Sequence, residues 1–168
     1  MNITEAIRNR RSIRKYKEGI AIPEQDIHAI LEAAMMAPSA RNTRPWEFIV
    51  IKDAGVKEKI ISVHPYAKHL REASLGIVVC GRPDLSGDDA EAFWPQDCGA
   101  AIENILLQAL ELGYGSCWCG IYPRQERTRE VQSILGITSI PVALITIGVA
   151  DEAPAARGYY DETRVKEI

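Results

Sequence analysis

A long apolar segment from Gln96 to Leu112 constrains the fold of this chain more than any other feature. Alanine, isoleucine and leucine fill so many of its positions that a helix here has almost no polar stripe. A helix that is apolar nearly all round must be buried on nearly all sides. A domain of this size has difficulty covering such a helix alone, so we expect it to lie at an interface between two subunits. The alternative is a central core helix in a monomer.

Shorter elements precede and follow this helix. The first two predicted strands are mostly apolar runs, which is typical of strands covered on both faces. Met35 and Met36, at the end of the second predicted helix, are expected to fill the core. Helices and buried strands alternate, which indicates a three-layer α/β or α+β fold. Helices are predicted at residues 4–9, 23–36, 53–62 and 123–135, strands at 46–51, 76–80, 116–121 and 142–149, and an extended tail at 151–168.

Length and charge exclude several classes of protein. The 168 residues fit one domain, residues 1–168, with enough material for a core. The net charge of −3 provides no global basic field, which argues against a nucleic-acid partner. No apolar run approaches the roughly 20 residues that a membrane span needs. The first 14 residues are charged and lack an apolar signal segment, so we expect a cytoplasmic protein.

The four cysteines do not follow a zinc-knuckle or thioredoxin-type spacing. Cys80 lies in an apolar run and is expected to be a small buried residue. Cys117 and Cys119 lie two apart, and therefore on the same face of a strand, and any redox role of this pair stays open. No metal site is predicted, because no histidine stands at ligand spacing from a cysteine.

Three arginines and a hydroxyl group gather in the run Arg10-Arg11-Ser12-Ile13-Arg14. Guanidinium is always charged, and its planar fork matches two phosphate oxygens at once. The Ser12 hydroxyl could bond to the same group. Most basic runs are solvated surface, and position alone does not distinguish that alternative from an anion site.

Three further features would complement an anion site. The loop Pro38–Asn42 offers the Ser39 hydroxyl, backbone amides and the Asn42 side chain, which pairs with a heterocycle edge. Arg157 stands among small residues in the C-terminal tail. Gly120 ends a predicted strand, where the backbone can approach a flat ring closely. Together they suggest a site for a planar anionic ligand.

These motifs also resemble a known family. The spacing R-R-S-x-R near residue 10 and P-S-x-x-N-x-x-P-W near residue 40 is similar to that of the nitroreductase family of flavoenzymes. The apolar helix, the C-W-C-G strand end and the C-terminal arginine fit the same pattern. The resemblance covers essentially the whole chain.

The resemblance implies a fold and a cofactor. The fold would be α+β with three α-β-α layers, a mixed or antiparallel central sheet and an intertwined homodimer, whose C-terminal tail 151–168 packs on the partner. FMN would lie at the subunit interface. Arg10 and Ser12 would hold its phosphate with Arg11 beside them, and Arg14 would lie towards the pyrimidine. The other subunit would contribute Pro38, Ser39, Ala40 and Asn42. The backbone of Cys119 and Gly120 would pass along the ring, and Arg157 would close on the phosphate.

The implied reaction is a ping-pong transfer. NADH or NADPH would reduce FMN at N5 and leave, and a nitroaromatic, quinone or similar electrophile would then take the electrons. No protein residue need be catalytic, because the cofactor carries the chemistry. The alternatives are a non-enzymatic flavin-binding module and a specialised flavin dehydrogenase or dehalogenase. Arg44 stands where many relatives have glutamine, and neither Tyr66 nor His69 matches a family contact, so the roles of these residues stay open. The identity of the electron acceptor also stays open.

Overall fold

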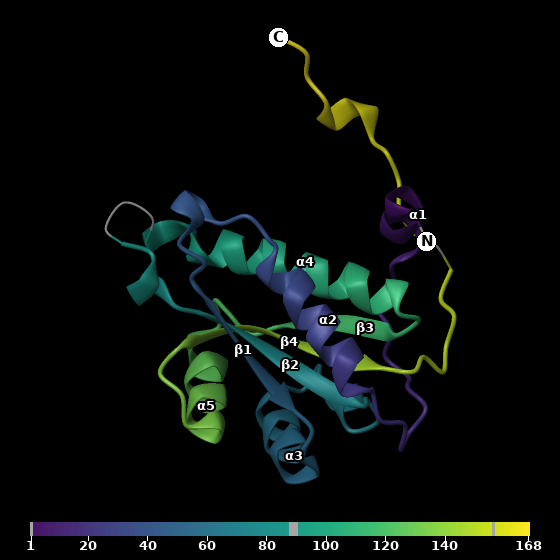
Figure 1. Cartoon of the computed structure of the whole chain (residues 1–168), viewed down its shortest axis with the longest axis vertical. Helices are drawn as coiled ribbons and strands as arrows, with labels where there is room; N and C mark the ends of the chain where they lie inside the picture. The colour runs from purple at the N-terminus through teal and green to yellow at the C-terminus, as the bar shows by residue number, and fades with distance from the viewer. Residues whose placement is uncertain (1, 88–90, 156) are drawn as a thin grey trace.

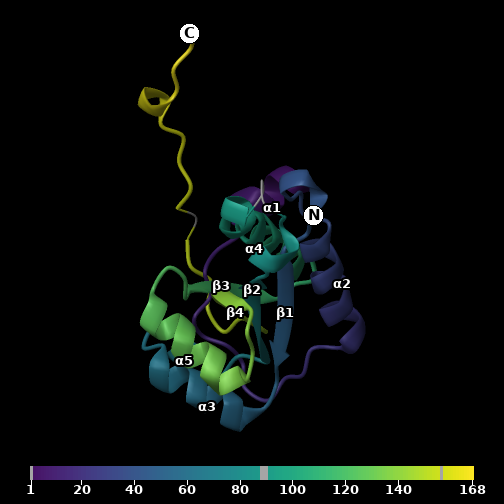
Figure 2. The ribbon, with the colours of Figure 1, turned by 90° about the vertical axis from the view of Figure 1, so that its left-hand side faces the viewer.

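The computed structural model describes residues 2–87, 91–155 and 157–168. Its centre is a four-stranded sheet in the order β1-β2-β4-β3, and each neighbouring pair is antiparallel. Two helices cover one face and two cover the other, so the three predicted layers are present (Figures 1 and 2). The strands are β1 (Trp46–Ile51), β2 (Leu75–Gly81), β3 (Gly115–Gly120) and β4 (Ile140–Gly148), and the helices are α1 (Ile3–Asn9), α2 (Glu24–Met35), α3 (Ala54–Val63), α4 (Trp94–Glu111) and α5 (Gln125–Leu135).

Alternation along the central strands separates two cores. Ile77 and Val79 of β2 face α2 and α4, whereas Val78 and Cys80 face α3 and α5. Successive side chains of a strand point to opposite faces, so a continuous apolar run serves both cores at once. The all-apolar pattern of β2 therefore follows from its place in the middle layer.

The helix α4 is buried mainly along one stripe. Its buried residues recur every three or four positions, which is the spacing of a single helix face. On the other side Ala100, Leu107 and Leu110 are only half-buried, and Glu103 is exposed. The expectation of burial on nearly all sides is therefore not met within one chain. The residual apolar surface is what a second subunit would cover.

Two packing expectations were wrong. The strand β1 lies at an edge of the sheet, and most of its residues are half-buried rather than covered on both faces. Met35 and Met36 are 47% and 71% exposed, because the α2 face that carries Ile27, Ile30 and Ala34 takes the core contact. Both residues stand where that helix ends.

The N-terminal segment after α1 runs along the sheet. Ser12 pairs with Ser116 of β3, and the amide of Ile13 donates to the Ser116 carbonyl at 2.9 Å. Tyr16 pairs with Ala150, just beyond β4. These pairings hold the arginine run against the β3 edge. In the described part of the chain, no helix is long and apolar enough to cross a membrane.

The C-terminal tail leaves the body of the chain after β4. It is extended apart from a short 3₁₀ turn at Glu162–Arg164, and its end projects away from the layers (Figures 1 and 2). Tyr159 and Tyr160 are more than 70% exposed. The predicted packing of this tail on a partner subunit stays a prediction.

Candidate functional site

The arginine run and the tail meet in one cavity of about 570 Å³. The helix α1 delivers the chain to it: Asn2 caps the first turn through a reciprocal bond with Glu5, and the helix ends at Asn9. The pairing of Ser12 with β3 then fixes the following residues. The cavity is lined by five of the predicted site residues: Arg10, Arg11, Ser12, Arg14 and Arg157.

Bonds within the chain hold Arg11 across the cavity wall. Its Nε donates to the Ala155 carbonyl at 3.2 Å and its Nη1 donates to the Arg10 carbonyl at 2.5 Å. The Nη2 atom is buried and has no hydrogen-bond partner among the residues that the structure describes. A buried charged donor without a partner is costly, and an anionic ligand would satisfy it. This atom is a direct indication of an anion site.

The neighbouring side chains set the charge balance. Arg10 Nε lies 3.5 Å from Glu103 Oε1 on α4, and both side chains are partly exposed. The Arg14 amide donates to the Glu152 carboxylate at 2.5 Å, so that carboxylate is engaged at the rim. Four arginines against one cavity carboxylate leave a net positive site. The donor set fits a phosphate group.

A second cavity of about 370 Å³ adjoins the first, because Arg14 lines both. It runs along the end of β3, where Trp118 is 41% exposed and Gly120 is also exposed. A Cβ atom added to Gly120 would meet nothing within 4 Å. A flat ring can therefore lie against this strand end while a phosphate occupies the first cavity.

Two residues that the sequence analysis left unassigned position this strand end. The Gly120 carbonyl accepts hydrogen bonds from His64 Nε2 at 3.0 Å and from Arg127 Nη1 at 3.1 Å. Burial, with a smaller effect of Arg127, lowers the pKa of His64 below its ordinary value. Tyr66 stacks under the Arg127 guanidinium at 5.9 Å. His64 lies 56 residues from Gly120, so no sequence spacing connects the two, whereas Arg127 is only seven residues away.

The loop Pro38–Asn42 has its own anchor. The Ala40 amide donates to the buried Asp97 of α4 at 3.0 Å, and the Ser39 hydroxyl accepts from the Arg44 amide at 2.9 Å. Arg44 Nε donates to Asn42 Oδ1 at 3.2 Å, which gives the arginine a role within the loop. Asn42 and Arg44 both adopt positive φ angles, at 56° and 53°.

This loop and the arginine cavity are separate within one chain. Among the described residues, none of Pro38, Ser39, Ala40 and Asn42 lines either cavity, and Asn42 lines another one with Met36 and Trp46. A shared site would therefore need the loop of a second subunit.

The expectation that no histidine lies near the cysteines was wrong. His69 lies beside the two cysteines of β3, with Nε2 3.5 Å from Cys119 Sγ. Its place in the short 3₁₀ helix η2 (Lys68–Leu70) brings it under the sheet, although it is about fifty residues away in sequence. No spacing rule could have found this neighbourhood, because it depends on the packing of η2 against β3.

The sequence and the fold have known counterparts. The model of the nitroreductase family matches residues 7–64 and 56–149. The chain belongs to the nitroreductase family. It is 42% identical over 167 residues to a Methanothermobacter thermautotrophicus protein named as an NADH dehydrogenase/NAD(P)H nitroreductase, a match that covers 98% of this chain and 86% of the relative.

Solved structures agree with this assignment. The crystal structure of a Parabacteroides distasonis protein named as an NADH dehydrogenase/NAD(P)H nitroreductase superposes with a TM-score of 0.91 at 32% identity, covering 98% of this chain and 96% of the other. An FMN-dependent nitroreductase from Clostridium difficile R20291 gives 0.82 at 32% identity, covering 98% of both chains. The predicted family and the predicted α+β fold are confirmed. This nitroreductase-family chain has the general role of an oxidoreductase.

Proposed function

We propose that this chain is an FMN-dependent oxidoreductase that takes electrons from NADH or NADPH and passes them to a small electrophile. The observation that carries the proposal is the arginine-lined cavity with the unpartnered Nη2 of Arg11, next to the open strand end at Gly120. The similar Clostridium difficile protein is described as FMN-dependent, which supports the choice of FMN. When bound, FMN would supply the two-electron redox chemistry.

The residues of the chain would divide the work of binding. Arg10, Arg11 and Ser12 would hold the phosphate, and Arg157 would close on it from the tail. Arg14 lies between the two cavities, and its positive charge would stabilise negative charge that develops on a ring placed along β3. Cys119 and Gly120 would contact that ring through their backbone.

The site would be completed by a second copy of the chain. Pro38, Ser39, Ala40 and Asn42 would approach from the partner, and the tail 151–168 would pack on it. The half-exposed apolar side of α4 and the projecting tail support a homodimer. The acceptor would be a nitroaromatic, a quinone or a similar electrophile, the reaction would follow ping-pong kinetics, and the protein would act in the cytoplasm.

The visible spectrum of the purified protein tests this function. We expect flavin absorption bands that bleach when NADH or NADPH is added without oxygen, and that return when a quinone is added. A yellow protein that neither nucleotide bleaches would instead be a flavin-binding module. A colourless protein that does not take up added FMN would refute the proposal.

A further inference from the structure

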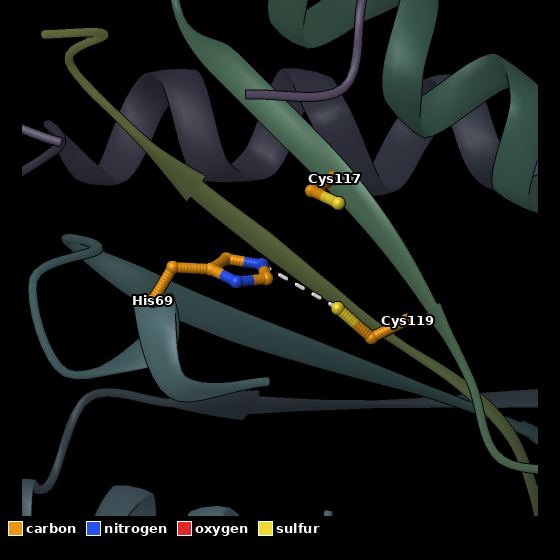
Figure 3. Close-up of side chains that lie close together, drawn as sticks. All are labelled: His69, Cys117 and Cys119. Atoms are coloured by element: carbon orange, nitrogen blue, oxygen red, sulfur yellow. Dashed lines mark hydrogen bonds between the residues drawn. The ribbon is translucent and has the colours of Figure 1, made fainter. Parts of the chain in front are cut away.

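A group of three metal-ligating side chains lies under the sheet. Cys117 and Cys119 project from the same face of β3, and His69 approaches them from η2 (Figure 3). The two sulfur atoms and a ring nitrogen all lie within 4.8 Å of one another. The three residues are at most 8% exposed. Two thiols and an imidazole therefore converge on one small buried space.

The distances approach those of a zinc site. Zinc bonds to sulfur at about 2.3 Å and to histidine nitrogen at about 2.0–2.1 Å, so a tetrahedral site separates these two ligands by about 3.5 Å. The distance from His69 Nε2 to Cys119 Sγ is 3.5 Å. The Cys117 sulfur lies within 4.8 Å of both other ligand atoms, whereas two sulfurs of a tetrahedral zinc site lie about 3.8 Å apart.

The charges of the ligands suit a divalent ion. Two thiolates and one divalent cation give a neutral centre, which a buried position tolerates far better than a net charge.

The other two cysteines, Cys80 and Cys98, are also buried. Among the described residues, neither belongs to a group of three potential ligands. The convergence of ligands therefore distinguishes the group on β3 from buried thiols elsewhere in the core.

We propose that His69, Cys117 and Cys119 bind one zinc(II) ion. The cavity of about 370 Å³ is lined by both cysteines, so it provides an entry path before a flavin ring lies along it, and a water molecule would take the fourth coordination position. The ion would link η2 to β3 on the opposite side of the strand from Trp118. The site adjoins the proposed flavin site, because the ring would lie along the same cavity and Cys119 belongs to both sites.

Cobalt(II) is the spectroscopic probe for this proposal. The full-length chain, reduced and free of any affinity tag, is titrated with cobalt and then with zinc. The titration is done with its flavin bound and again after flavin removal, because the ring would occupy the same cavity. We expect one cobalt per chain, a thiolate-to-cobalt charge-transfer band and the intense visible bands of tetrahedral geometry, all removed by stoichiometric zinc. Cys117→Ser should weaken binding at least tenfold, whereas Cys98→Ala, which removes a buried thiol on the other face of the sheet, should leave it unchanged.

A wild-type measurement keeps the proposal falsifiable if the variants fold poorly. Alkylation of each cysteine during unfolding is followed by mass spectrometry of its peptide. Zinc should slow the alkylation of Cys117 and Cys119 and leave the alkylation of Cys98 unchanged. No stoichiometric cobalt or zinc binding by the wild type would overturn the proposal. So would a bound cobalt ion without a thiolate band, unprotected thiols, or a site that takes only copper(I).

Discussion

Replacement of Arg10 by alanine should weaken FMN binding while leaving the fold nearly intact. Its guanidinium lies 3.5 Å from Glu103, and the two side chains are 31% and 48% exposed. Exposed ion pairs of this kind contribute about 0–1 kcal/mol, so the free energy of unfolding should change by less than that. A hydrogen bond to a charged group contributes about 1.5–3 kcal/mol. The dissociation constant for FMN should therefore rise by about 10- to 160-fold.

Quenching of FMN fluorescence during a titration with apoprotein measures this dissociation constant. Arg8→Ala is the matched control, because Arg8 is exposed on α1 and does not line the cavity. It removes the same charge two residues away, so a loss caused by net charge alone would appear in both variants. An Arg10→Ala protein that binds FMN within a factor of about two of the wild type would refute the assignment of Arg10 to the phosphate.

Three further predictions follow from the same structure. Gly120→Ala should weaken FMN binding but change the free energy of unfolding, measured by chemical denaturation, by less than about 0.5 kcal/mol, because its Cβ meets nothing within 4 Å. Gly115→Ala, whose Cβ would lie 2.9 Å from Ile13, should lower the free energy of unfolding by about 1–3 kcal/mol in the same measurement. Sedimentation should give a particle of two 18.6 kDa chains, and a clean single-chain species would contradict the shared site. Because burial lowers the pKa of His64 in the folded chain, the unfolded chain binds the proton first, so stability should be complete above about pH 6.5 and decline as the pH falls below it. His64→Gln should flatten that decline, and an unchanged slope would count against a neutral buried imidazole.

Local patterns predicted most of the fold. The apolar spacing, the cap at Asp53 and the glycines after α4 place each α-helix and strand to within a few residues, whereas the short 3₁₀ helices were not predicted. Burial was harder to predict, because it depends on sheet order. The sequence of β1 is as apolar as a central strand, yet β1 lies at the edge, where it has one neighbouring strand instead of two.

Part of the candidate site could be predicted because it is local. Arg10, Arg11, Ser12 and Arg14 are consecutive or nearly so, and the pairing of Ser12 with β3 turns them to one cavity. Arg157 joins them only because the chain after β4 returns past the same edge.

The parts that sequence reasoning missed depend on packing between distant elements. His64 reaches the Gly120 carbonyl from the end of α3, and His69 reaches Cys119 from η2. These pairs are about fifty residues apart, and no periodicity or spacing connects them.

A crystal structure of the FMN-bound protein tests the central claim most directly. The account predicts density for the phosphate among Arg10, Arg11, Ser12 and Arg157, with the ring along Trp118–Gly120 and the partner's loop against it. The chain also has a larger cavity of about 800 Å³ lined by Arg124 and Arg127 with two glutamates. A phosphate found in that cavity, or a ring away from β3, would contradict the account.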